Sequence, residues 1–224
     1  MRVALAVSLV CLCAAVAAPL GGAAGECHGL QVCVPVHGPW VVTNRNVRTT
    51  FLLSCGKHGV VGGLDAVTTS SAVRVSFEGR IGAPVQPGVT TTTSAVFHGV
   101  GIGVPTASFQ PWLGCVPASG GGGRSTVSAR SRPGPSLDPH AKTLVVAPGS
   151  VKTMSVGCVE GERLIGGWDA LAFRTVKAPD LANVKHVKIV RATAGGRVHI
   201  TVSATDDLPI AAHAVVQVGA ECAP

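Results

Sequence analysis

Two carboxylates stand at matching positions in the chain, and they are its first candidates for chemistry. Asp65 follows Gly62-Gly63 and Asp169 follows Gly166-Gly167. Such residues could bind Ca²⁺ or another ligand, or form a carboxylate pair. Neither has a second acidic residue at the spacing of an EF-hand loop, so the favoured interpretation is a glycine bulge whose Asp bonds nearby amides. Both remain candidate ligand-binding residues, and we expect no metal or cofactor.

Catalytic motifs are almost missing from the sequence. Ser54-Cys55-Gly56-Lys57 matches the Ser-x-x-Lys of penicillin-recognising enzymes, but the Lys-Thr-Gly motif of those enzymes does not follow. Gly-x-Ser-x-Gly and His-Glu-x-x-His do not occur. His98 alternates in phase with Val96 and Val100, which predicts a core histidine with a satisfied hydrogen bond. We therefore assign no catalytic residue.

Basic residues gather between positions 174 and 197. The stretch holds six cations, among them Lys185, Lys188 and Arg191, against Asp180 alone. Such a stretch can attract an anionic partner, for example a cell-wall polymer or a membrane surface. Trp168 could stack on a sugar, although tryptophan in small units is more often core. Nucleic acid is not expected, because no aromatic residues are interleaved with the basic ones.

The N-terminus predicts export. Met1-Arg2 is followed by an apolar run and then by small residues up to Ala24. This is typical of a secretory signal peptide over 1–24, and the apolar run is too short to span a membrane. We expect a secreted, extracellular protein with a formal net charge of +7, or +6 once Arg2 is removed.

Six cysteines follow the leader, and an even number in an exported chain predicts three disulfides. A zinc site that uses neighbouring histidines is disfavoured, because the Cys27–Cys33 spacing is not that of a zinc knuckle. The six residues are Cys27, Cys33, Cys55, Cys115, Cys158 and Cys222.

The sequence repeats itself at long range. Val41-Val42 recurs as Val145-Val146, 104 residues later, and the segment 62–66 recurs as 166–170 at the same offset. Self-similarity of this kind predicts a duplicated unit. The simplest pairing then closes each copy on itself, as Cys55–Cys115 and Cys158–Cys222, and leaves Cys27–Cys33 as a small loop. Pairing between the copies is the competing scheme.

Hydrophobic alternation and turn residues predict strands rather than helices. Val198, Ile200 and Val202 alternate with polar residues, and Gly195-Gly196 precede them as a hairpin turn. The expected fold is all-β, with two tandem, disulfide-closed, antiparallel β-sandwich-like units related by internal duplication. The predicted boundaries are a signal peptide 1–24, an N-terminal segment 25–39, unit one 40–117, a Gly/Ser/Arg/Pro-rich linker 118–143 and unit two 144–224.

Cys-His-Gly-Leu-Gln-Val-Cys at 27–33, Gly38-Pro39-Trp40 and the two Cys…Gly-Gly units carry a family resemblance. On these motifs the chain resembles secreted, Ala/Val/Gly-rich two-repeat proteins of unknown function from high-GC actinobacteria. The resemblance implies no activity. The residues favour a secreted, non-catalytic binding or structural protein that recognises anionic or glycan polymers of the cell envelope. The alternative is a secreted hydrolase with an unrecognised Asp/His site.

Overall fold

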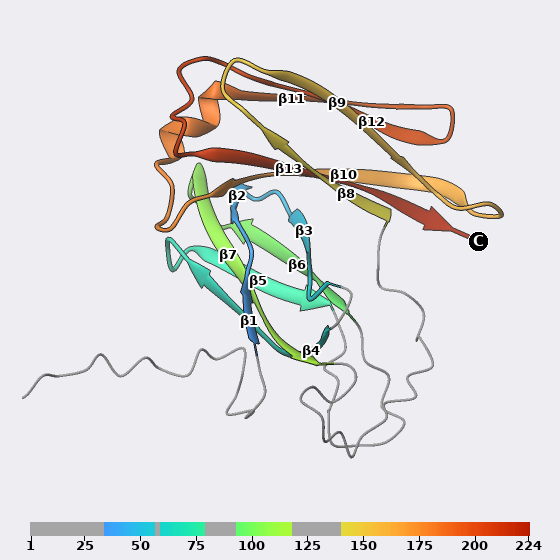
Figure 1. Cartoon of the computed structure of the whole chain (residues 1–224), viewed down its shortest axis with the longest axis horizontal. Helices are drawn as coiled ribbons and strands as arrows, with labels where there is room; N and C mark the ends of the chain where they lie inside the picture. The colour runs from blue at the N-terminus through green and yellow to red at the C-terminus, as the bar shows by residue number, and fades with distance from the viewer. Residues whose placement is uncertain (1–33, 57–58, 79–92, 118–139) are drawn as a thin grey trace, which may run out of the picture.

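The computed structural model describes residues 34–56, 59–78, 93–117 and 140–224, and in them the chain is an antiparallel all-β protein (Figure 1). In this part of the chain no helix is long and apolar enough to cross a membrane. The elements are β1 (Val34–His37), β2 (Trp40–Asn44), β3 (Thr49–Ser54), β4 (Gly59–Thr68), β5 (Val73–Glu78), β6 (Ser94–Gly101), β7 (Thr106–Pro117), β8 (His140–Val146), β9 (Val151–Gly157), β10 (Arg163–Arg174), the 3₁₀ helix η1 (Leu181–His186), β11 (Val187–Ala194), β12 (Arg197–Ala204) and β13 (His213–Ala223).

The strands form three sheets. A central sheet of seven strands contains β1, β7, β2, β10, β13 and β8 in this order, with β4 also paired to β7. The first small sheet has the order β3-β6-β5 and the second small sheet has the order β11-β12-β9. The pairings β2–β7–β4 of the first half therefore have a counterpart in β8–β13–β10 of the second half.

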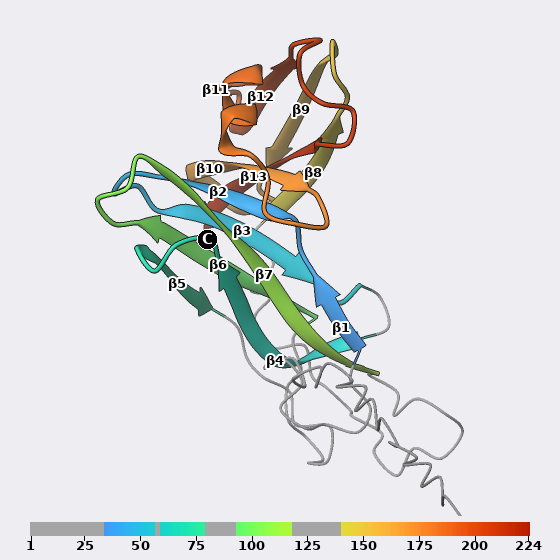
Figure 2. The ribbon, with the colours of Figure 1, turned by 90° about the vertical axis from the view of Figure 1, so that its left-hand side faces the viewer.

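The two halves meet in the central sheet rather than at a linker. Strand β2 pairs with β10 through Val41 opposite Ala172 and Trp40 opposite Phe173. Val41 belongs to the core of the first half, whereas its neighbour Val42 belongs to the core of the second. Because successive residues of a strand face opposite sides, the two small sheets cover opposite faces of the central sheet (Figures 1 and 2).

Each core also takes residues from the other half. Ala170, Ala172 and Val215 of the second half are buried with Phe97 and Phe109 of the first. The shared burial joins both units into one body, held together by the hydrophobic effect as well as by strand pairing.

A buried glutamine forms hydrogen bonds with the edge strand of the first small sheet. Gln217 of β13 is 4% exposed. Its Oε1 accepts from the backbone N–H of Leu52 at 2.6 Å, and its Nε2 donates to the Leu52 carbonyl at 3.0 Å and to Thr143 Oγ1 at 3.2 Å. Strand β3 is an edge strand, so this side chain satisfies backbone groups that no strand reaches.

The two long disulfides are present as predicted, Cys55–Cys115 in the first half and Cys158–Cys222 in the second. Cys27 and Cys33, together with the predicted signal peptide, lie outside the described residues. One predicted boundary needs correction, because residues 140–143 belong to β8 and not to the linker. Their backbone pairs with that of β13, beginning with His140 opposite Ala220. Backbone pairing of this kind needs no apolar side chain. The rest of the predicted linker lies outside the described residues.

Candidate functional site

The two candidate aspartates lie directly after irregularities in strand pairing. The register shifts between Val61 and Gly63 in β4 and between Leu164 and Gly166 in β10, as the glycine-bulge interpretation predicts. Strands β4 and β10 are separated by β7 and β2, which puts them about 14 Å apart across the sheet at ~4.8 Å per strand. The structure therefore does not bring Asp65 and Asp169 together as a carboxylate pair.

Each aspartate has a local partner. Asp65 Oδ1 accepts from the backbone N–H of Ala66 at 2.7 Å. Asp169 Oδ1 accepts from Arg191 Nη1 at 2.6 Å, across the sandwich from β10 to β11. Two of the predicted ligand-binding residues thus neutralise each other.

Trp168 is buried rather than presented to solvent. It is 9% exposed, and its indole ring lies over Gly219 of the neighbouring strand β13, where any side chain would collide with it. A sugar cannot stack on a ring that is covered in this way. Trp168 is therefore a core residue, which is the more common role of tryptophan in small units.

Lys185 and Lys188 are exposed, on η1 and β11 respectively. Lys188 lies directly opposite Ser203 of β12, and residues directly opposite in an antiparallel pair share a face. In β12 buried and exposed residues alternate, which identifies the solvent side of the second small sheet. This outer face consists of Val151, Thr153, Ser155 and Gly157 of β9, Arg197, His199, Thr201 and Ser203 of β12, and Lys188, Val190, Ala192 and Ala194 of β11.

The outer face is open and has one sign of charge. Val190 is 51% exposed and Val151 67% exposed, so within the described ranges no other element packs on these side chains. Its twelve residues include two cations, a histidine and four hydroxyls, but no carboxylate. Lys188 lies near one end and Arg197 at the other, about 20 Å apart at ~3.3 Å per residue. Except for His199, the side chains between them are short.

Hydrogen bonding within this face is weak. Arg197 Nε donates to Ser155 Oγ at 3.4 Å, and His199 Nε2 lies 3.3 Å from the Ala194 carbonyl. Both distances are at the long end of the hydrogen-bond range, so these donors can turn to a ligand at little cost. The arrangement can bind an extended, hydroxyl-rich anion.

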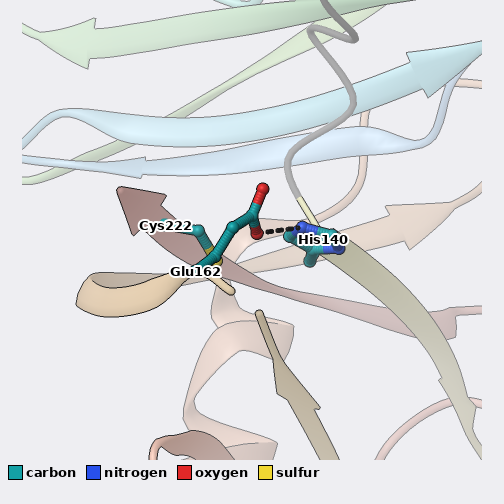
Figure 3. Close-up of side chains that lie close together, drawn as sticks. All are labelled: His140, Glu162 and Cys222. Carbon is teal, nitrogen blue, oxygen red and sulfur yellow. Dashed lines mark hydrogen bonds and ion pairs between the residues drawn. The ribbon is translucent and has the colours of Figure 1, made fainter. Parts of the chain in front are cut away.

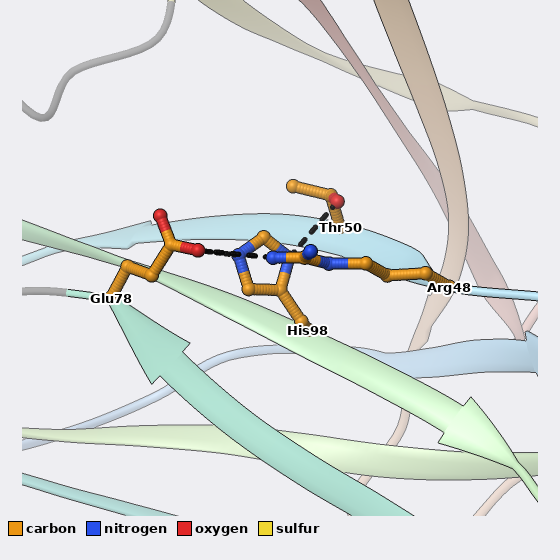
Figure 4. Close-up of polar contacts among 4 residues, drawn as sticks. All are labelled: Arg48, Thr50, Glu78 and His98. Atoms are coloured by element: carbon orange, nitrogen blue, oxygen red, sulfur yellow. Dashed lines mark hydrogen bonds and ion pairs between the residues drawn. The ribbon is translucent and has the colours of Figure 1, made fainter.

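The corresponding face of the first small sheet is buried along its central strand. His98 of β6 is 8% exposed and has a polar partner on each ring nitrogen (Figure 4). Its Nε2 lies 3.1 Å from Glu78 Oε1, and its Nδ1 lies 3.1 Å from Thr50 Oγ1. Arg48 Nη2 donates to the same Glu78 oxygen at 3.0 Å.

The partners settle the proton positions of this network. A carboxylate only accepts, so Nε2 of His98 carries the proton and Nδ1 accepts from the Thr50 hydroxyl. Burial, and next the Arg48 charge, lower the pKa of His98 below its usual 6.5, although Glu78 acts in the opposite direction. His98 is therefore a neutral, satisfied histidine, as predicted. Its partners Thr50 and Glu78 could not be predicted from the sequence, because they lie 48 and 20 residues away along the chain.

A third polar group lies beside the second disulfide (Figure 3). His140, Glu162 and Cys222 place one potential ligand atom each within 4.8 Å of one another. His140 Nε2 and Glu162 Oε2 are 3.0 Å apart. No sequence pattern predicted this group, because its members come from three separate segments.

Comparison with known proteins identifies no relative. No protein-family model, curated protein or solved structure matches the chain. The placement of the side chains is therefore the basis for any function.

Proposed function

We propose that this chain is a secreted, non-catalytic protein that binds anionic, hydroxyl-rich polymers of the cell envelope. The single observation that carries the proposal is the outer face of the second small sheet. It combines exposure, short side chains, hydroxyls and two cations with no carboxylate. An open basic face of this kind favours binding of a polymer along the surface over catalysis in a cleft.

The remaining basic candidates divide into two groups. Lys185 lies in η1, immediately before β11, and can extend the positive surface. Arg191 is held by Asp169 and contributes little to it. The binding face therefore depends mainly on Lys188 and Arg197, the second of which was not among the predicted ligand-binding residues.

Export and duplication belong to the same proposal. The leader over 1–24 and the two disulfides support an oxidising, extracellular location. The matched strand pairings of the two halves support an origin by internal duplication. In this view one copy kept an open small sheet for binding, while the other covered its own.

The test is co-sedimentation of the mature chain with purified cell wall at low salt. We expect retention that falls as salt rises, because exposed charges are screened. Lys188→Gln with Arg197→Gln should weaken retention about tenfold, which corresponds to ~1.4 kcal/mol. Lys142→Gln with Arg163→Gln is the matched control, since it removes the same charge from exposed residues of the central sheet.

Two results would overturn the proposal. One is a wild-type chain that does not sediment with cell wall at low salt. The other is equal weakening by the face variant and the control, since this would leave only the net charge of the chain as the cause.

A hydrolase is the second candidate, and one observation favours it. Glu78, His98 and Thr50 form a carboxylate–imidazole–hydroxyl row, the order found in nucleophilic triads. It ranks below binding because His98 is buried and Arg48 competes for the same Glu78 oxygen. Hydrolysis of an activated ester that His98→Gln abolishes would favour this candidate.

A further inference from the structure

We propose that reduction of the Cys158–Cys222 disulfide creates a site for a transition-metal ion, with zinc the best match. The ligands would be both cysteine sulfurs, His140 and Glu162. This site lies in the central sheet and the β9–β10 turn, and it does not depend on the function proposed above.

The group is built from three segments that meet at one end of the second half. His140 begins β8, Glu162 precedes β10, and Cys222 lies near the end of β13. The imidazole and carboxylate are each about one-third exposed, and they already point toward one another at 3.0 Å (Figure 3). An ion can therefore reach them from solvent.

The backbone fixes these positions independently of the disulfide. His140 lies opposite Ala220 in the β8–β13 pair, and Cys222 lies opposite Leu164 in the β10–β13 pair. The turn that contains Glu162 is closed by its own N–H, which donates to the Val159 carbonyl at 3.1 Å. Opening the sulfur–sulfur bond thus leaves the three ligand-bearing segments in place.

The spacing suits a tetrahedral ion. Zinc holds its ligands at about 2.0–2.3 Å, which sets ligand atoms roughly 3.3–3.8 Å apart. The ligand atoms of His140, Glu162 and Cys222 lie within 4.8 Å of one another, and side-chain rotation closes the difference. The fourth ligand, the Cys158 sulfur, is held next to the Cys222 sulfur by the disulfide and would be released by its reduction. Two sulfurs, one nitrogen and one oxygen are ligands that zinc accepts.

In the oxidised protein this site is blocked. The Cys222 sulfur is bonded to Cys158, and a disulfide sulfur lacks the charge of the thiolate that binds zinc. A dithiol delivers two electrons and two protons, which converts the protein disulfide to two thiols and the dithiol to a cyclic disulfide. Binding of Zn²⁺ then displaces both thiol protons to water.

The first half supplies an internal control. Cys55–Cys115 is the corresponding disulfide of the first half. Among the described residues, no group of three metal-binding side chains includes either of its cysteines. Zinc should therefore distinguish the two cysteine pairs within a single molecule.

The test is cysteine alkylation mapped by mass spectrometry on the full mature chain. The chain is reduced with a phosphine, because dithiols themselves bind zinc. We expect Zn²⁺ to slow alkylation of Cys158 and Cys222 about tenfold or more and that of Cys55 and Cys115 less than twofold. Cobalt in place of zinc should give thiolate-to-metal absorption in the near ultraviolet.

Variants decide the role of the two side-chain ligands. His140→Gln and Glu162→Gln should each remove the protection by zinc, whereas His199→Gln, on the outer face of the second small sheet, should retain it. Equal protection of both cysteine pairs, or protection that survives both ligand variants, would overturn the proposal. Loss of the β-sheet circular dichroism on reduction would also overturn it, since the site requires the fold.

Discussion

At the scale of single residues, His98 shows how a buried polar group becomes part of a core. The ring accepts one hydrogen bond and donates another, which accounts for both nitrogens of a neutral imidazole. A protonated ring would have to donate from both nitrogens, and Thr50 would lose its acceptor. Burial and the Arg48 charge lower the pKa of His98 and favour this neutral form, against the opposing effect of Glu78.

The lowered pKa of His98 makes stability depend on pH. Above the usual value of 6.5 the histidine is neutral in both folded and unfolded chains, and its full contribution is present. As the pH falls below 6.5, the unfolded chain binds the proton first, so the free energy of unfolding decreases down to the lower folded pKa. We expect the denaturant concentration at the unfolding midpoint to decrease as the pH is lowered from 7 to 5.

His98→Gln isolates this effect from that of the other histidines. The variant should be less stable at pH 7, because it disturbs the Glu78 and Thr50 hydrogen bonds, but its midpoint should change less with pH. His213→Gln is a suitable control, because His213 is exposed. A His98→Gln variant with the same pH slope as the wild type would contradict the assignment.

At the scale of elements, side-chain alternation was informative wherever one face of a strand is buried. The strand over Val198–Val202, the Gly195-Gly196 turn and both glycine bulges were predictable, because each depends on local residue types. The start of β8 was not, since an edge strand can pair through its backbone alone. The pairing of β2 with β10 was also hidden, because it joins residues about 130 positions apart.

For the candidate site, too, local properties could be predicted from the sequence and long-range contacts could not. Lys188 could be predicted as an exposed cation, but Arg191 and Asp169 were predicted without knowledge that they face each other across a sandwich. Arg197 belongs to the predicted basic stretch but was not among the predicted ligand-binding residues, because no local pattern reveals that it shares a face with Lys188. Long-range pairing thus decides which charges are free, and the sequence patterns did not contain it.

Gln217 gives a prediction for how the elements are joined. Gln217→Leu should preserve most of the side-chain volume but leave both backbone groups of Leu52 unpaired, at a cost of about 2–3 kcal/mol in the free energy of unfolding. Thr143→Ala, which removes only the third hydrogen bond, should cost about 1 kcal/mol or less. Urea denaturation measures both effects. Equal stability of Gln217→Leu and the wild type would show that the hydrogen bonds between Gln217 and Leu52 do not stabilise the fold.

At the scale of the whole molecule, the two halves differ in what they leave open. The small sheet of the first half has a central strand, β6, whose residues are nearly all buried, whereas alternate residues of β12 are exposed. In the part of the chain that the structure describes, the outer face of the small sheet is therefore more open in the second half than in the first. This asymmetry favours a single binding surface with the first half as its support, rather than a bivalent binder.

The shared central sheet predicts that both halves unfold together. Strand β2 contributes to both cores, and Ala170, Ala172 and Val215 would be exposed if the second half separated. We expect a single cooperative transition with the disulfides intact. Trp112 and Trp168 report on different halves, so variants with either as the sole tryptophan, the others replaced by phenylalanine, should show midpoints of denaturation that coincide with each other and with circular dichroism.

Separate midpoints for the two tryptophans would contradict this, and would mean that β2 can leave β10 while each sandwich stays folded. The fragment 140–224 provides an independent check, because it retains its own disulfide and small sheet but lacks the cover on Ala170, Ala172 and Val215. We expect it to have a lower thermal midpoint than the whole chain and to self-associate through that exposed apolar face. An isolated fragment as stable as the full chain, and monomeric, would show that the halves are joined in space without stabilising each other.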